Sequence, residues 1–207
     1  MPPSEEFIHN SMFGLFGFIS IVALLLLSVL VILTTPEDSE EAADNVPKVI
    51  SSPLASNAHI TWSEYFMSVA RLAALRSKDP CSKVGACIVN SQNKIVATGY
   101  NGMPNGVHDD KVPWGKEGPF YETKYAYVVH AELNAILNSV LTDQTGCRVY
   151  VTLFPCNECA KAIIQSGIRH VIYLSDKHKD KDSTRVSKKM LRLANVEFEQ
   201  FKGSLLI

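Results

Sequence analysis

The chain has 207 residues, with 20 lysines and arginines, 21 acidic residues and a formal net charge of −1. Because basic and acidic residues are nearly equal in number, the composition does not indicate a basic surface. We therefore do not expect duplex or single-stranded nucleic acid as a partner. The length suits one domain of ordinary size with additional segments. The cysteine count of five is odd, which argues against a complete set of disulfides.

A long apolar run lies near the N-terminus. Residues 7–36 contain no Asp, Glu, Lys or Arg, and residues 13–33 are almost wholly apolar. A run of this length can span a bilayer as a helix. We therefore predict an N-terminal segment at residues 1–12 and a transmembrane helix at residues 13–34.

A cleaved signal peptide is the alternative to a membrane anchor. Such a peptide begins with basic residues, but here Glu5 and Glu6 precede the run, and no small-x-small cleavage site ends it. Neither flank of the run is basic, so the positive-inside rule assigns no orientation. Residues 35–59 are acidic at first and then punctuated by Ser and Pro, which is typical of a flexible acidic linker.

A folded domain is predicted at residues 60–207. It opens on Thr61-Trp62-Ser63-Glu64, which has the form of a capping box at the start of a helix. Apolar residues then recur at helical spacing, which predicts a helix with one face packed on the core. These residues are Trp62, Phe66, Val69, Ala70 and Ala73. The positive charges of residues 76–78 favour the end of the helix before Asp79-Pro80.

Strands and helices follow in a regular order. Two β-branched runs, residues 83–90 and 94–100, predict a hairpin. Residues 101–129 form an irregular stretch rich in Gly and Pro, and its length favours a functional role. The remaining predicted elements are a helix at 131–141, a strand at 147–153, a helix at 157–166, a strand at 169–174, a charged loop at 176–182, a helix at 184–194 and a strand at 196–201.

The order of these elements predicts the fold class. Strands that alternate with helices favour parallel pairing, here beside the antiparallel hairpin. We therefore predict an α/β fold, namely a three-layer α/β/α domain with a mixed five-stranded sheet.

Two motifs open two of the predicted helices. His130-Ala131-Glu132 offers an imidazole and a carboxylate, and Pro155-Cys156-x-x-Cys159 offers two thiols that can both reach one metal ion. Helix starts favour thiolates through the helix dipole and free backbone N–H groups. We predict that His130, Cys156 and Cys159 bind Zn²⁺. Glu132, beside the metal but not bound to it, is the candidate proton carrier of a catalytic site.

Two alternatives remain for these cysteines. A C-x-x-C pair can be a redox dithiol. A zinc site can also be purely structural, although such a site has a fourth Cys or His and no need of Glu132. The other two cysteines in apolar runs, Cys87 and Cys147, are interpreted as small core residues.

Several segments carry a family resemblance. They are YFMSVA, RSKDP, VGACIVN, GYNGMPNG, ETKYAYVVHAELNAIL and YVTLFPCNECAK, and the similarity as a whole runs from about Trp62 to Phe201. They resemble the deoxycytidylate (dCMP) deaminase family, within the cytidine deaminase superfamily, whose zinc signature is H-x-E with P-C-x-x-C. The resemblance implies hydrolysis of dCMP to dUMP and ammonia, which feeds dTMP synthesis. It also implies a zinc-activated water as the nucleophile and Glu132 as the proton shuttle.

The resemblance further implies contacts with nucleotides. Asn101 matches an Asn that contacts the sugar, with a turn-forming Asn as the alternative. Ser77 and Lys78 match neighbours of the phosphate, with a solvated helix end as the alternative. Gly102 and Asn105 lie in a loop that resembles the region for effector nucleotides. Activation by dCTP, inhibition by dTTP and assembly as a homohexamer are implied in the same way.

The apolar run and the acidic linker lie outside the resemblance. We expect a single-pass membrane protein whose catalytic domain faces the cytosol, where dCMP and reduced thiols are found. We expect a cytoplasmic protein if the N-terminal segment is absent or removed. Two alternative functions stay open: a zinc deaminase for another cytidine or adenosine substrate, and a zinc-stabilised, non-catalytic nucleotide-sensing subunit. The presence of Glu132 argues against the second of these.

Overall fold

The computed structural model describes residues 59–205, which belong to one compact unit. The predicted segments at 1–12 and 13–34, and nearly all of the linker predicted at 35–59, lie outside these residues. Within the described part of the chain, none of the helices combines the length and the apolar character needed to cross a membrane.

The elements follow the predicted order closely. The α-helices are α2 (Trp62–Ala74), α3 (Ala131–Leu137), α4 (Asn157–Gln165) and α5 (Asp182–Leu193). The strands are β1 (Gly85–Val89), β2 (Ile95–Tyr100), β3 (Arg148–Leu153), β4 (His170–Ser175) and β5 (Glu197–Gln200). Two 3₁₀ helices, η1 (Phe120–Glu122) and η2 (Lys124–Ala126), interrupt the long irregular stretch.

The five strands form one mixed sheet in the order β2-β1-β3-β4-β5. β1 pairs antiparallel with both β2 and β3, whereas β3–β4 and β4–β5 are parallel pairs. The parallel pairs need crossover connections, which α4 and α5 provide. The predicted mixed five-stranded sheet is therefore confirmed.

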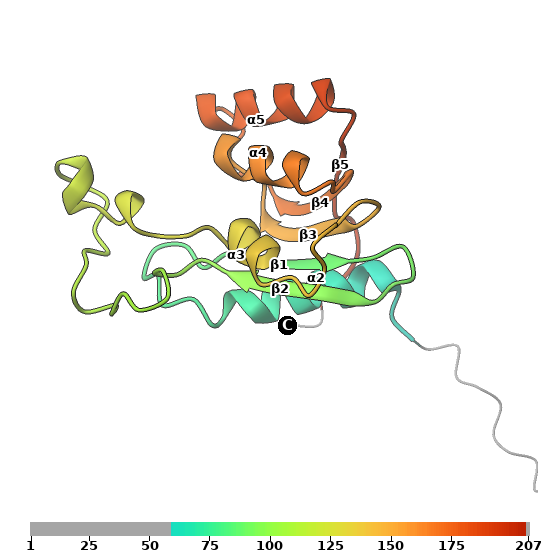
Figure 1. The fold of residues 1–207 in the computed structure, drawn as a ribbon, viewed down its shortest axis with the longest axis horizontal. Helices are drawn as coiled ribbons and strands as arrows, with labels where there is room; N and C mark the ends of the chain where they lie inside the picture. Colours follow the sequence, from blue (N-terminus) through green and yellow to red (C-terminus); the bar gives the residue numbers. More distant parts are fainter. Residues whose placement is uncertain (1–58, 206–207) are drawn as a thin grey trace, which may run out of the picture. The chain divides into compact units, whose positions relative to one another are not determined.

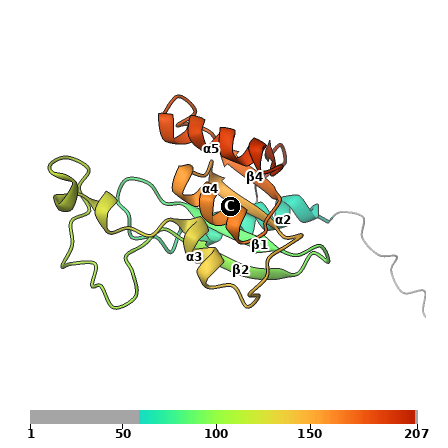
Figure 2. The same cartoon turned by 45° about the horizontal axis from the view of Figure 1, so that its top comes forward.

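The helices cover both faces of the sheet (Figure 1). On one face, α2 buries Phe66, Met67 and Ala70 against Cys87 and other strand residues. On the opposite face lie α3, α4 and α5, whose buried small and branched residues pack on the alternate side chains of the same strands. Figure 2 shows the same arrangement from a tilted direction. This is the predicted three-layer arrangement, and Cys87 is a buried core residue as predicted.

The N-terminus of α2 contains the predicted capping box. The Thr61 hydroxyl accepts a hydrogen bond from the Glu64 N–H at 3.2 Å, and the Thr61 N–H donates to the Glu64 carboxylate at 2.9 Å. The prediction that Trp62 lies in the core is wrong, because its side chain is 58% exposed. Trp62 stacks on Phe66 with ring centroids 5.5 Å apart and covers that buried ring from the solvent side.

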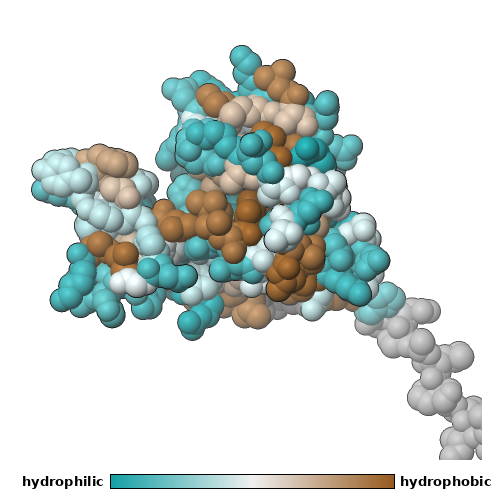
Figure 3. Space-filling view, viewed as in Figure 1, coloured by the Kyte–Doolittle hydropathy of each residue, from teal (hydrophilic) through white to brown (hydrophobic). Residues whose placement is uncertain are grey.

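Helix α3 ends at Leu137, four residues earlier than predicted. The Leu141 N–H donates a hydrogen bond to the Ser139 hydroxyl at 3.1 Å. This bond replaces the backbone hydrogen bond that would continue the helix. The shorter helix leaves Leu137 and Val140 exposed. Figure 3 shows apolar surface, in brown, in the region where Figure 1 places α3.

Candidate metal centre

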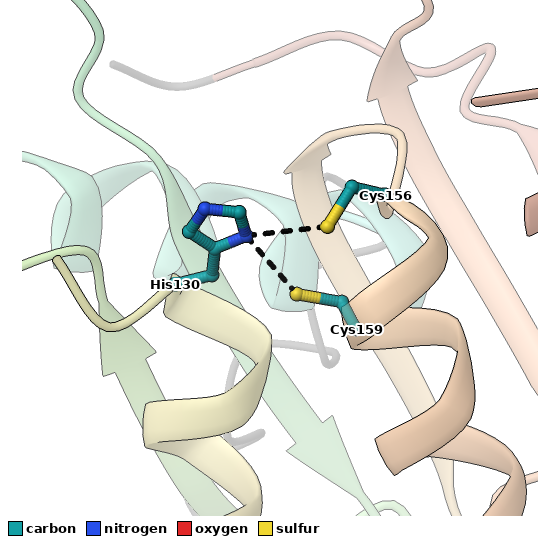
Figure 4. A group of neighbouring side chains, drawn as sticks. All are labelled: His130, Cys156 and Cys159. Carbon is teal, nitrogen blue, oxygen red and sulfur yellow. Dashed lines mark hydrogen bonds between the residues drawn. The ribbon is translucent and has the colours of Figure 1, made fainter. Parts of the chain in front are cut away.

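The two motifs predicted to bind zinc meet at the N-termini of two neighbouring helices. His130 is the N-cap residue of α3 and Cys156 is the N-cap residue of α4, with Cys159 in the first turn of α4. The Nδ1 atom of His130 lies 3.4 Å from the Cys156 sulfur and 3.3 Å from the Cys159 sulfur. Figure 4 shows the three side chains pointing toward one another.

A buried turn holds the start of α4 in place. Phe154 is 5% exposed and packs edge-on against Tyr173 and Phe198, with ring centroids 4.8 and 5.5 Å apart. Its N–H donates to the Ser175 carbonyl at 2.8 Å, and Pro155 is fully buried. Phe154, two residues before the first cysteine, is therefore fixed to β4 and β5, and these contacts set the direction in which α4 begins.

The three side chains fit a zinc ion. The ligand atoms of His130, Cys156 and Cys159 all lie within 4.8 Å of one another. A tetrahedral site with Zn–N of about 2.0 Å and Zn–S of about 2.3 Å places neighbouring ligand atoms about 3.5 Å apart. The two nitrogen–sulfur distances are close to this value. Among the described residues no fourth Cys, His, Asp or Glu joins the group, which is the composition of a site with one position open.

The protein groups around the sulfurs favour a thiolate. The pKa of the Cys156 thiol is lowered to about 3, because Cys159 and His130 hydrogen-bond to its sulfur. The same hydrogen bonding, together with burial, raises the pKa of Cys159, so Cys159 holds its proton more tightly than Cys156 does. The hydrogen bond with Cys156 also raises the pKa of His130 to about 9. A metal ion that binds here must displace these protons.

Glu132 lies beside the three ligands but is not one of them. It occupies the first turn of α3 and is 4% exposed. Burial raises the pKa of its carboxyl group, while His130 acts in the opposite direction. A bound dication lowers the pKa of a nearby carboxyl group as well. A buried carboxyl group that does not bind the metal has the position expected of a proton carrier.

Asn101 and Ser77 lie together in a buried hydrogen-bond network. The Asn101 Oδ1 accepts from the Val84 N–H at 2.8 Å, and its Nδ2 donates to the Ser82 carbonyl at 2.9 Å and to Asp79 at 3.2 Å. The Ser77 hydroxyl donates to the Asn101 carbonyl at 2.8 Å. Contact of Asn101 with a sugar stays a prediction, as does contact of Ser77 with a phosphate. Both side chains already have partners within the protein.

The other predicted nucleotide contacts lie nearer to solvent. Lys78 is exposed and forms an ion pair with Asp109. Gly102 forms an isolated antiparallel bridge with Val129, the residue before His130. Asn105 is exposed in a turn. The structure brings Gly102 next to the segment that leads into the metal site, and the roles of all three residues stay predictions.

The sequence did not indicate one buried pair near these residues. In the sequence, Asp79 indicates only the end of the first helix together with Pro80, and no pattern distinguishes Lys124. The two side chains form an ion pair with exposures of 2% and 7%. Asp and Lys are usually surface residues, so neither position stands out in the sequence. Only the fold distinguishes them, because it brings the irregular stretch at residues 101–129 against the loop between α2 and β1.

The site depends on close packing between α3 and β2. A Cβ atom added at Gly99 would lie 2.3 Å from the Ala131 oxygen and 2.4 Å from the Ala135 nitrogen, both in the α3 backbone. We predict that Gly99→Ala displaces α3, destabilises the protein by roughly 1–3 kcal/mol and weakens zinc binding. Urea unfolding and the zinc content of the purified protein measure these two effects.

Gly85→Ala is the matched control for this prediction. A Cβ at Gly85 would lie 2.0 Å from the Ala70 oxygen, so it displaces α2 on the opposite face of the sheet. The control should lose comparable stability while its folded fraction keeps the zinc content of the wild type. Equal zinc contents in the two variants would contradict the specific dependence of the site on the α3 contact.

Comparisons with known proteins agree with the geometry. Residues 60–175 match the family described as the cytidine and deoxycytidylate deaminase zinc-binding region. The chain is 58% identical over 144 residues to the deoxycytidylate deaminase of Homo sapiens, covering 69% of this chain and 81% of that protein. It is 51% identical over 167 residues to the probable deoxycytidylate deaminase of Drosophila melanogaster, covering 77% and 82% of the two chains.

A solved structure shows a similar fold. It is the dCMP deaminase of the cyanophage S-TIM5 in complex with dCMP and dUMP, which is 30% identical to this chain. The TM-score is 0.54, and the match covers 69% of this chain and 100% of that chain.

Proposed function

Because the chain belongs to the cytidine and deoxycytidylate deaminase family, we propose that it converts dCMP to dUMP and ammonia by zinc-dependent hydrolysis. The observation that carries this proposal is the convergence of His130, Cys156 and Cys159 beside the buried Glu132. The high identity to dCMP deaminases specifies the substrate as a deoxycytidine nucleotide.

The residues around the site divide the chemistry between them. His130, Cys156 and Cys159 would hold a zinc ion, which acts as a Lewis acid and lowers the pKa of a water molecule at the open position. Glu132 accepts the proton that this water loses and delivers it to ring nitrogen 3 of the cytosine. The oxygen of the same water would add to carbon 4 of the ring. Glu132 then carries the second proton of this oxygen to the amino group on carbon 4, so that the C–N bond breaks, ammonia leaves and the added oxygen remains as the carbonyl.

We also propose that Asn101, Ser77 and Lys78 lie on the side of the site that receives the sugar and phosphate. The buried network around Asn101 supports this placement, because it lies at the end of β2, directly before the Gly102 bridge to the segment that leads into His130. Lys78 is exposed in the loop that follows α2, next to Ser77, and can present a positive charge to a phosphate group.

For regulation, we propose dCTP as activator and dTTP as inhibitor, bound at the loop that contains Gly102 and Asn105. The backbone bridge between Gly102 and Val129 supports this proposal, because it links that loop directly to the segment before His130. At a subsaturating dCMP concentration, dCTP should raise the rate and dTTP should lower it.

A homohexamer is the proposed assembly. Exposed apolar side chains at or near two helices support self-association, since exposed apolar surface is often covered by a partner. They are Trp62, Leu72 and Leu75 at α2, and Leu137 and Val140 at α3.

We propose that the apolar residues 13–34 anchor the protein as a single-pass membrane protein with its catalytic domain facing the cytosol. The support is the length of the uncharged run in the sequence. The full chain should stay with the membrane fraction after a carbonate wash, and a chain that lacks residues 1–56 should not. Recovery of the full chain in the soluble fraction would contradict the anchor and favour a cytoplasmic protein.

The substrate proposal is tested with the full chain purified in mild detergent and loaded with zinc. Loss of cytosine absorbance is followed with dCMP, deoxycytidine, CMP and a single-stranded RNA as separate substrates. We expect dCMP to be consumed with the highest kcat/KM by a wide margin. If another of these substrates has a higher kcat/KM than dCMP, that substrate replaces dCMP in the proposal. If none of them is converted, the non-catalytic nucleotide-sensing subunit remains as the alternative.

A further inference from the structure

The buried ion pair between Asp79 and Lys124 joins three segments of the chain. Asp79 lies between α2 and β1, and Lys124 begins η2 in the long segment before the metal site. The Oδ1 atom of Asp79 accepts the N–H groups of Cys81 and Ser82 at 2.8 and 3.0 Å. Its Oδ2 atom accepts from the Asn101 side chain and from the Lys124 ammonium group. One carboxylate thus binds the α2–β1 loop, the end of β2 and η2.

The stability of the fold does not explain this pair. Removing two charges from water costs about as much free energy as their attraction returns, so a buried ion pair adds little net stability. Its geometry is nevertheless specific, because four donors converge on one carboxylate. The pKa of Asp79 lies below its ordinary value: burial opposes this shift, but Lys124 and the N–H groups of Cys81 and Ser82 outweigh it. A buried ion pair of this kind fixes the relative positions of the segments that it joins more than it adds to the stability of the fold.

The segment that contains Lys124 leads directly to the metal site. The Lys124 carbonyl accepts the N–H groups of Tyr127 and Val128 at 3.0 and 2.9 Å. The next residue, Val129, exchanges two backbone hydrogen bonds with Gly102 at 3.1 and 2.9 Å, and His130 follows it. The Asp79 carboxylate, which pairs with Lys124, also accepts a hydrogen bond from the side chain of Asn101. The pair therefore sets the distance between the end of β2 and the segment before His130.

We propose that Asp79 and Lys124 are positioning residues, which hold Asn101 and the segment from Lys124 to Val129 in register beside the metal site. Neither residue is among the metal ligands, and both act through other groups. The effect on turnover rests on the proposed function, whereas the effect on the loop does not. Glu132 is carried by α3, which packs on β2 through Gly99, so its proton transfers should depend little on the pair.

The first test is Lys124→Met, which keeps the aliphatic stem and removes the charge. Rates are expressed per bound zinc ion. We expect KM for dCMP to rise roughly tenfold or more, because the protein groups proposed to bind the substrate are misplaced. The value of kcat should stay within about threefold of the wild type. Lys124→Arg restores the charge and should recover most of this loss. Lys111→Met is the matched control, because Lys111 lies in the same long segment in an exposed pair with Asp110, and its KM should not change.

Hydrogen exchange provides a readout independent of turnover. In Lys124→Met, the amides of Cys81, Ser82 and Val84 should exchange faster, since Asp79 and Asn101 accept their hydrogen bonds. Exchange in the strands distant from the pair should not change. If the wild type fails to convert dCMP, the proposed function is wrong, and this exchange pattern still decides the positioning role.

A purely structural role gives a different result. It lowers the yield of folded protein but leaves KM per zinc-loaded chain at the wild-type value, and that outcome would overturn the proposal. If Lys124→Met does not fold, the double variant Asp79→Asn/Lys124→Gln replaces it, because it buries no unpaired charge. We expect this variant to fold and to show the raised KM, and a wild-type KM there would equally overturn the proposal.

Discussion

Glu132→Gln should lower kcat for dCMP by about a thousandfold or more while the zinc content stays at one ion per chain. Positioned acid–base groups contribute about 10²–10⁴-fold to a rate, and here one carboxyl group is proposed to serve two proton transfers. Glutamine has nearly the same shape but cannot carry the proton. Because Glu132 is 4% exposed, bulk water has little access to replace it. Cytosine absorbance and metal analysis on the same sample measure both quantities.

The chain offers a matched control within the second motif. Glu158 lies between the two cysteines, but its side chain is 67% exposed and pairs with Lys161. Glu158→Gln should therefore keep kcat within about twofold, since exposed ion pairs contribute little. Wild-type turnover by Glu132→Gln, or an equal loss in both variants, would show that Glu132 is not the proton carrier.

Cys159→Ser should remove most of the zinc and, with it, the activity. Cys159 is 2% exposed and its sulfur lies 3.3 Å from the His130 nitrogen, so a serine hydroxyl at this position replaces a soft thiolate by a poor zinc ligand. Since the loss of an outer partner of a ligand already costs about 10–100-fold in affinity, we expect the loss of the ligand itself to exceed a hundredfold. Competition with a chromophoric chelator measures the affinity.

Cys81→Ser is the control for this second prediction. Cys81 is exposed and lies outside the metal site, so its replacement should change neither zinc content nor turnover. Full zinc content in Cys159→Ser would contradict the assignment of the ligands. Loss of zinc from both variants would indicate a general sensitivity to cysteine replacement instead of a metal site.

The sequence predicted those parts of the structure that local patterns determine. The capping box at Thr61, the hairpin of β1 and β2, and the two helices whose N-cap residues are His130 and Cys156 each follow from neighbouring residues. The ligand set followed as well, because the spacing of Cys156 and Cys159 at a helix start leaves few ways to arrange the two sulfurs. The zinc centre was thus predictable from two short motifs.

The remaining features depend on contacts between distant segments. Lys124 is a charged residue in an irregular stretch of the sequence. It is buried because the fold brings it to Asp79, 45 residues away in the chain, with which it forms an ion pair. Trp62 has the spacing of a core residue but caps the ring of Phe66 at the surface. The periodicity of a helix identifies its apolar face, but it does not say how far the opposing sheet extends beneath that face.

The most direct test of the central proposal is a zinc titration of dCMP turnover. The purified full chain is stripped with a chelator, and Zn²⁺ is added in steps while the conversion of dCMP to dUMP is followed. We predict no turnover without zinc, a rate that rises in proportion to the metal, and a plateau at one ion per chain. Turnover that is independent of zinc, or a fully zinc-loaded protein that leaves dCMP unchanged, would contradict the proposal.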